Sequence, residues 1–365
     1  MTLLLRAMQS VRPGRTDVVL PSYTCYSLAA STMKAGLRPR LVDIDPATLD
    51  FVPEHLDRLD FSRTLAIVAT NLYGLPNDLA RLSSIARDRG VFLIDDAAQS
   101  MGATVSGRWS GTCGDAGIFS FDKGKPASAI DGGVIVTNSD ELAVAIRHKA
   151  PDSTPRPLLA SAVPMAKAVV YAGLLRPWLY WIPNGIPFLG LGQTEYTTEF
   201  SMAGPDRFLS ALGVSALDRL EGYVNTRRRN ATALMSALQS LARIHQVRPV
   251  PGTAPTYLRL PILLEDRVTR EEALASLRRA GIGASSSYPR ALVDVPELAE
   301  VMRDQVGEAS GGRFVADRLL TLPTHPYVTA ADIQTMTDVL SEVTGSRVGS
   351  TVVDPAQQTS LCAES

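Results

Sequence analysis

The chain has 365 residues, of which 45% are hydrophobic, so it is long enough for about two domains with a full core. Its 36 basic and 37 acidic residues nearly cancel, which argues against a nucleic acid or an anionic membrane as partner. The three cysteines (Cys25, Cys113 and Cys362) and the four histidines lie far apart. We therefore expect no metal site and no disulfide framework, and a reducing cytoplasm as the location.

The first 150 residues alternate short apolar runs with amphipathic stretches. Continuous runs of valine, isoleucine, leucine and phenylalanine predict strands at 18–20, 40–43, 65–70, 91–94, 117–121 and 134–137. Helical spacing predicts helices at 27–35, 54–59, 79–89 and 141–149, and the first eight residues look like the inside of an amphipathic helix. Strand–helix repetition favours a largely parallel sheet with helices on both faces.

The segment 157–192 is unusually apolar, but charges and prolines interrupt it too often for a membrane span. We favour burial at a domain or subunit interface; the alternative is an in-plane membrane contact, which its tryptophans and tyrosines would suit. The predicted division is a large domain at 1–150, this linker or interface segment at 151–204, a small domain at 205–345 and a disordered tail at 346–365.

The predicted small domain mixes helices with a strand. Helices are expected at 208–241, 270–280, 314–320 and 330–343, and a strand at 257–264. Three consecutive arginines, Arg227 to Arg229, are interpreted as a solvated helix face. The fold class predicted for the whole chain is therefore α/β, with a smaller α+β region at the C-terminal end.

Polar residues follow successive predicted strands, and ligands of parallel sheets bind at the carboxyl ends of strands. Asp96 and Gln99 follow the fourth strand, while Ser120 and Lys125 follow the fifth. A lysine that enters a cleft can form a Schiff base with a carbonyl compound. Neighbouring residues have simpler interpretations, Asp95 as a helix N-cap and Lys123 as a solvated side chain.

The ordered set of motifs resembles the DegT/DnrJ/EryC1/StrS family of pyridoxal-phosphate-dependent sugar aminotransferases. The resemblance covers most of residues 17–345 and is strongest before residue 140. The matching motifs are Val19-Leu20-Pro21-Ser22-Tyr23-Thr24, Val42-Asp43-Ile44-Asp45, Leu72-Tyr73-Gly74-Leu75-Pro76, Asp95-Asp96-Ala97-Ala98-Gln99, Phe119-Ser120-Phe121 with Lys125, Gly132-Gly133 leading to Val136-Thr137-Asn138, and Leu322-Pro323-Thr324-His325-Pro326. The resemblance implies the fold type I architecture, a mostly parallel sheet between helices plus a smaller α+β domain.

The resemblance also implies roles for single residues. Lys125 matches the lysine that holds pyridoxal phosphate and then acts as general base, and Asp96 matches the carboxylate that pairs with the pyridine nitrogen. Gln99 matches an amide near the ring's phenolic oxygen, and Ser120 matches a phosphate ligand. Cys25 stands where many relatives place an aromatic residue that stacks on the ring.

The chain departs from the family pattern in three places. The glycine-containing loop that holds the cofactor phosphate precedes the first helix in relatives, whereas residue 1 falls inside that helix here. We expect either a start codon assigned too far downstream or a truncated chain. Residues 202–207 match the relatives poorly, and Tyr288, in a loop that approaches the substrate in relatives, is either a substrate contact or a packed core tyrosine.

Three functions remain open from the sequence. The leading one is transfer of an amino group from an amino-acid donor to a keto-sugar of the nucleotide-sugar type, in polysaccharide or secondary-metabolite sugar biosynthesis. The others are a different pyridoxal-phosphate reaction on the same residues and a non-catalytic paralogue that lacks the phosphate loop. The resemblance further implies a homodimer, because relatives build each site from two subunits.

Overall fold

The computed structural model describes residues 1–150, 196–200, 207–305 and 309–345, with the single residues 165, 166, 168, 170, 202 and 204. Apart from those single residues, the apolar segment 157–192 lies outside the described residues, as does the predicted tail 346–365. The interface, membrane-contact and tail interpretations therefore stay predictions, as do the domain boundaries. No helix in the described part of the chain is long and apolar enough to cross a membrane.

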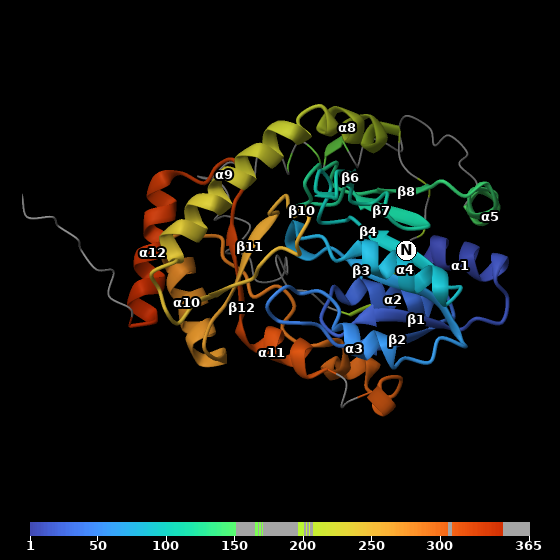
Figure 1. Ribbon diagram of the computed structural model, residues 1–365. Coiled ribbons are helices and arrows are strands. Elements are labelled where there is room, and N and C mark those ends of the chain that lie inside the picture. The colour runs from blue at the N-terminus through green and yellow to red at the C-terminus, as the bar shows by residue number, and fades with distance from the viewer. Residues whose placement is uncertain are drawn as a thin grey trace, which may run out of the picture.

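A six-stranded sheet forms the centre of the molecule, with the strand order β2-β1-β3-β4-β7-β8 (Figure 1). Its strands are β1 (Asp17–Pro21), β2 (Arg38–Val42), β3 (Thr64–Thr70), β4 (Phe92–Asp96), β7 (Ala116–Ser120) and β8 (Gly133–Thr137). All neighbouring pairs are parallel except β7 and β8, which are antiparallel. The predicted strands and the largely parallel sheet are thus confirmed.

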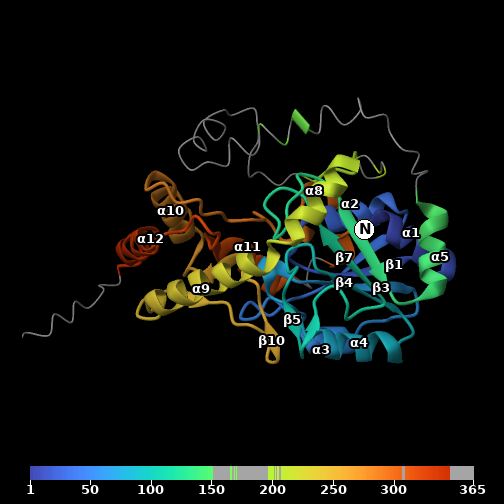
Figure 2. The ribbon, with the colours of Figure 1, turned by 90° about the horizontal axis from the view of Figure 1, so that it is seen from above.

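Helices cover both faces of this sheet (Figure 2). They are α1 (Thr2–Val11), α2 (Tyr26–Lys34), α3 (Pro53–Asp57), α4 (Leu79–Asp88) and α5 (Asp140–Lys149). Side chains alternate along a strand, so Leu20 of β1 belongs to the hydrophobic cluster that includes Leu4 of α1, whereas its neighbour Val19 belongs to the cluster that includes Leu82 of α4. Because both faces of the sheet are covered, the strands β1, β3 and β4 are buried along their whole length.

The second region packs helices on a three-stranded antiparallel sheet of order β12-β11-β9. Its strands are β9 (His245–Gln246), β11 (Arg259–Leu263) and β12 (Leu319–Pro323), and its helices are α8 (Arg207–Leu217), α9 (Leu220–Leu238), α10 (Arg267–Arg279), α11 (Ser310–Arg318) and α12 (Ala330–Val343). A smaller three-stranded sheet contains β5 (Thr104–Val105), β6 (Arg108–Trp109) and β10 (Thr253–Ala254). Of these strands, β10 comes from the second region.

Two predicted helices were wrong in extent. The stretch 208–241 contains two helices, because α8 ends at Leu217 and α9 begins at Leu220. The stretch 314–320 combines the end of α11 with the start of β12, and the sequence analysis missed this strand. A five-residue apolar run that directly continues a helix carries no periodicity that separates strand from helix.

The arginines of α9 are not a solvated face. Arg227 donates to the carbonyl oxygen of Leu258 at 2.7 Å. Arg228 donates to the carbonyl oxygens of Pro255 at 2.8 Å, Ala254 at 3.2 Å and Gly102 at 3.4 Å. Of the three, only Arg229 is exposed. The first two arginines tie α9 to the loop before β11, and Arg228 also reaches the large sheet's side of the molecule.

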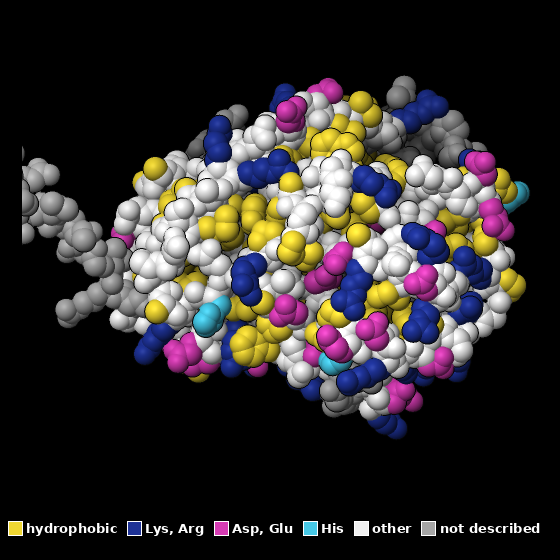
Figure 3. Space-filling view, in the orientation of Figure 1, with side chains coloured by type: hydrophobic (Ala, Val, Ile, Leu, Met, Phe, Trp, Pro, Cys, Tyr) yellow, Lys and Arg dark blue, Asp and Glu magenta, His cyan; other side chains and the backbone are white. Residues whose placement is uncertain are grey.

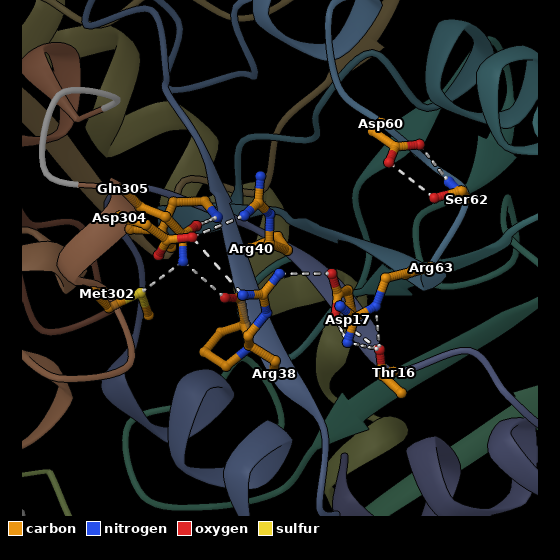
Figure 4. Close-up of polar contacts among 12 residues, drawn as sticks. Thr16, Asp17, Arg38, Arg40, Asp60, Ser62, Arg63, Met302, Asp304 and Gln305 are labelled. Atoms are coloured by element: carbon orange, nitrogen blue, oxygen red, sulfur yellow. Dashed lines mark hydrogen bonds and ion pairs between the residues drawn. The ribbon is translucent and has the colours of Figure 1, made fainter.

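The free edge of the large sheet at β2 is covered by the second region (Figure 4). The amide of Gln305 accepts the N–H of Leu41 at 2.6 Å and donates to the carbonyl oxygen of Pro39 at 3.2 Å, as a neighbouring strand would. Asp304 beside it forms ion pairs with Arg40 at 3.4 Å and Arg38 at 3.8 Å. Pairing the edge in this way blocks association with other strands.

Candidate functional site

The predicted site residues lie at the carboxyl ends of neighbouring strands. Asp96 is the last residue of β4 and Ser120 the last residue of β7, and these two strands are adjacent and parallel. Lys125 lies on the loop between β7 and β8. The sheet topology therefore brings these three residues to the edge where parallel sheets bind ligands.

Asp96 is a buried carboxylate within electrostatic reach of a cation. Its Oδ1 accepts the N–H of Ala98 at 3.0 Å. Burial raises the pKa of Asp96, and the nearby charge of Lys125 acts in the opposite direction. Lys125 is half-buried, whereas Lys123 is exposed, as predicted. The charge of Lys125 thus acts on a buried acid at the end of β4.

The loop that carries Lys125 is closed at its base. Phe121 donates its N–H to Gly132 at 2.9 Å and accepts from Ala129 at 2.7 Å, which joins the two ends of the loop. Gly132 has a φ of 109°, a conformation open to glycine, and it permits the predicted tight turn before β8. Ser120 Oγ accepts the N–H of Asp122 at 3.3 Å.

Asp95 has a structural role, but it is not the predicted helix N-cap. Its carboxylate accepts hydrogen bonds from Asn71 Nδ2 at 2.8 Å, from the N–H of Gly111 at 2.6 Å and from the N–H of Cys113 at 3.1 Å. Burial raises its pKa to about 6. Asp95 therefore fixes the loops that follow β3 and precede β7.

The amide of Gln99 links the large sheet to the second region. Its Oε1 accepts the N–H of Tyr73 at 2.9 Å, and its Nε2 donates to the hydroxyl of Tyr288 at 3.0 Å. Both oxygen and nitrogen are thus engaged, and the side-chain position of Gln99 is fixed. Tyr288, which the sequence left as either a substrate contact or a core tyrosine, thus lies in direct contact with Gln99, a candidate cofactor-binding residue.

Cys25 lies at the rim of the same cluster. Its sulfur is 3.0 Å from Ser27 Oγ and the side chain is half-buried at the N-terminal end of α2. Burial raises the pKa of Tyr288 well above the usual value for tyrosine, and the neighbouring Cys25 acts in the same direction. The rings of Tyr23 and Tyr26 pack on Tyr288 with centroids 5.6 and 5.9 Å away.

Tyr73 is a member of this cluster to which sequence analysis gave no role. Its φ is 57°, unusual for a residue with a side chain, and it lies in the turn Leu72–Gly74 after β3. Its hydroxyl is 3.4 Å from that of Tyr23. A Cβ on the adjacent Gly74 would collide with Thr256, so the second region packs directly on this turn. The signal in the sequence was the Tyr-Gly pair at a strand end.

The comparisons with known proteins show the family of the chain. The model of the DegT/DnrJ/EryC1/StrS aminotransferase family matches residues 1–155 and 200–341. The chain belongs to the DegT/DnrJ/EryC1/StrS aminotransferase family. It is 28% identical over 327 residues to UDP-2-acetamido-2-deoxy-3-oxo-D-glucuronate aminotransferase of Pseudomonas aeruginosa, covering 89% of this chain and 78% of the relative.

Two further relatives support the assignment over nearly the whole chain. GDP-perosamine synthase of Caulobacter vibrioides is 29% identical over 349 residues, which is 93% of this chain and 82% of that protein. The crystal structure of the aminotransferase TlmJ from Streptoalloteichus hindustanus is 26% identical, with a TM-score of 0.69 over 94% of this chain and 83% of that one. The resemblance noted in the sequence and the predicted fold type I class are confirmed.

Aminotransferases of this family depend on pyridoxal phosphate, and the residues present fit that group. A buried carboxylate such as Asp96 suits a protonated ring nitrogen. A half-buried lysine lies near that carboxylate, and a hydroxyl, that of Ser120, ends the adjacent strand. These residues thus provide an amine, a buried acid and a hydroxyl, which are groups of the kinds that the cofactor needs.

Proposed function

We propose that this chain is a pyridoxal-phosphate-dependent aminotransferase that moves an amino group from an amino-acid donor to a keto-sugar. The observation that carries the proposal is the buried Asp96 at the end of β4, whose pKa the charge of the half-buried Lys125 acts to lower from the loop after β7. When bound, the cofactor supplies an electron sink and carries the amino group between donor and acceptor. The donor leaves as a keto acid, and the acceptor carbonyl becomes an amine.

Each residue of the cluster has a task in this proposal. Lys125 would hold the cofactor through Nζ and would move a proton to and from the substrate carbon. Asp96 holds the ring nitrogen protonated, and Ser120 holds the phosphate. Gln99 positions the ring near its phenolic oxygen, and Tyr288 fixes Gln99. Cys25 would pack on the ring with less contact than an aromatic side chain would give.

The relatives suggest the class of acceptor. Several carry names of aminotransferases that act on nucleotide-linked keto-sugars, and one is named for 2-deoxy-scyllo-inosose. We propose an acceptor of this type, in polysaccharide or secondary-metabolite sugar biosynthesis. We further propose a homodimer in the cytoplasm.

The direct test separates the two halves of the reaction. The protein is loaded with pyridoxal phosphate and mixed with single amino acids, and the visible spectrum of the cofactor is followed together with the keto acid released. We expect one or a few amino acids to convert the cofactor to its amine form with one equivalent of keto acid. Release of carbon dioxide or of ammonia without cofactor conversion would indicate another pyridoxal-phosphate reaction and contradict the proposal.

A further inference from the structure

The turn after β3 lies in the interior, away from the mixed basic and acidic side chains of the surface (Figure 3). Tyr73 in this turn has a φ of 57°, and the next residue, Gly74, has a φ of 85°. A Cβ at Gly74 would lie 2.9 Å from the backbone nitrogen of Tyr257, which itself has a φ of 50°. Left-handed residues with side chains persist where the surrounding structure holds them, and they gather at functional sites.

Contacts on both sides hold Tyr73 in this conformation. Its side chain is 2% exposed, and its hydroxyl lies 3.4 Å from that of Tyr23. On the main chain, the N–H of Thr256 donates to the carbonyl oxygen of Gly74 at 2.9 Å. The N–H of Tyr73 donates to Oε1 of Gln99 at 2.9 Å. The strained residue is thus bonded directly to a candidate cofactor-binding residue.

This bond decides which end of the Gln99 amide is oxygen and which is nitrogen. A main-chain N–H can only donate, whereas a tyrosine hydroxyl can donate or accept. The bond from Tyr73 therefore requires Oε1 on its side, and Nε2 lies on the other side, where it donates to the hydroxyl of Tyr288 at 3.0 Å. With the amide reversed, Nε2 would meet the N–H of Tyr73, donor against donor. Tyr288 alone would allow both orientations.

One proton of Nε2 remains for a ligand. The group carries two protons, one of which goes to Tyr288, and among the residues that the structure describes the other has no acceptor. Gln99 is 9% exposed, so solvent reaches little of it. A ligand oxygen that accepts this proton would satisfy a buried donor, which is costly to leave unpaired.

We propose that Tyr73 is a positioning residue of the candidate site: its left-handed main chain fixes the amide of Gln99 so that Gln99 offers a bound ligand a donor and no acceptor. The inference rests on the proposed function, because the ligand oxygen would be the phenolic oxygen of the cofactor. The ring of Tyr73 acts indirectly, by keeping the main chain in a conformation that is otherwise unfavourable.

Tyr73→Gly and Tyr73→Ala separate the backbone from the ring. Both variants lose the ring, but glycine adopts a positive φ freely, whereas alanine retains the strain without the ring contacts that hold it. The protein without cofactor is prepared with isotope-labelled glutamine, and NMR measures solvent exchange of the Gln99 side-chain proton bonded to Tyr288. Gln99→Glu identifies the signal by its loss.

We expect slow exchange in the wild type and in Tyr73→Gly. In Tyr73→Ala the exchange should be about tenfold faster, which corresponds to the free-energy cost of the left-handed conformation for a residue with a side chain. Equal exchange in the two variants would overturn the proposal, because the ring or neither group would then hold the amide. Fast exchange in the wild type would overturn it as well.

If the Tyr73 variants do not fold, Gln99→Glu tests the amide orientation through cofactor affinity. This variant keeps an oxygen for the N–H of Tyr73 but replaces the donor by a second oxygen. We expect the Kd for pyridoxal phosphate to rise by about tenfold or more, since a hydrogen bond to a charged group contributes that much. The control Gln239→Glu adds the same charge at an exposed position and should bind as the wild type does.

Equal affinity of Gln99→Glu and Gln239→Glu would overturn the proposal, because Gln99 would then not act as a donor. A wild type that binds no pyridoxal phosphate would contradict the proposed function. The exchange measurement needs no cofactor, so it would still decide whether the main chain of Tyr73 holds Gln99.

Discussion

The Nε2 of Gln99 donates a hydrogen bond of 3.0 Å to the hydroxyl of Tyr288, which lies 189 residues further along the chain. Gln99 follows a strand of the large sheet, whereas Tyr288 lies on a loop of the second region. The Oε1 of the same amide accepts a hydrogen bond from the N–H of Tyr73, which lies on a third segment, the turn after β3. One side chain thus sets the relative position of three segments around the candidate site.

Tyr288→Phe should remove the hydrogen bond to Gln99 and leave the ring packing in place. The phenyl ring keeps the packing on Tyr23 and Tyr26, but the buried Nε2 of Gln99 loses its acceptor, at a cost of about 1–3 kcal/mol. We expect a lower free energy of unfolding in urea and a lower kcat for amino transfer. The matched control is Tyr327→Phe, because the Tyr327 side chain is exposed. Equal behaviour of the two variants would contradict this role for Tyr288.

The arginines of α9 allow a comparison between neighbours. Arg228→Ala removes hydrogen bonds to three backbone carbonyl oxygens, so we expect a loss of about 1–3 kcal/mol in the free energy of unfolding. Arg229→Ala makes the same substitution at an exposed position of the same helix. We expect it to lower the free energy of unfolding by less than about 0.5 kcal/mol. Equilibrium denaturation measures both. Similar losses in the two variants would support the solvated face that the sequence suggested.

The raised pKa of Asp50 should make the folded state less stable as the pH rises. Burial raises the pKa of its carboxyl to about 6 in the folded state, whereas an unfolded chain releases this proton near pH 4. Between these values the folded state binds more protons, so the free energy of unfolding decreases with rising pH. The decrease from this group should be on the order of 2 kcal/mol. Asp50→Asn cannot ionise and should remove that part.

Urea unfolding at intervals between pH 4 and pH 6 measures the slope. Asp95 contributes in the same direction, because burial raises its pKa to about 6 as well, so the slope should shrink rather than vanish. Asp88→Asn, an exposed change on α4, is the control for the loss of one charge. A slope in Asp50→Asn equal to that of the control would show that Asp50 is not the group responsible.

The pKa of Asp43 is shifted in the opposite direction to that of Asp50. Burial acts to raise its pKa, but hydrogen bonds from Gly311, Ser22, Gly312 and Ile44 outweigh it, and the net shift is downward. Its stabilisation is therefore complete above the unfolded pKa and is lost as the pH falls through the folded one. Asp43→Asn should weaken the junction of α11 with the large sheet by about 1–3 kcal/mol at pH 7 and by less in acid. A loss independent of pH would contradict this.

The sequence predicted those parts of the fold that follow from local periodicity. The strands β1, β3 and β4 are buried along their whole length and are rich in apolar residues, so residues such as Val19 and Leu20 could be assigned without the structure. The strand Leu319–Pro323 could not, because it continues directly from a helix and its antiparallel partner β11 lies about 60 residues earlier in the chain.

The candidate site divides in the same way. Asp96 and Ser120 end strands and Lys125 follows one, so all three could be located from the rule for parallel sheets. The contact of Gln99 with Tyr288 joins distant segments, and the unusual backbone of Tyr73 is a tertiary effect that no local pattern encodes. The burial of Arg227 also depends on chain outside α9, so a run of three arginines suggested solvent instead.

The most direct test of the account is covalent capture of the cofactor. The protein is incubated with pyridoxal phosphate and reduced with borohydride, and the modified peptide is mapped for the wild type, Lys125→Ala and Lys123→Ala. The account predicts a visible band, modification at Lys125, its loss in Lys125→Ala and its retention in Lys123→Ala. Modification at another lysine, or none in the wild type, would contradict the assignment of Lys125 as the cofactor lysine.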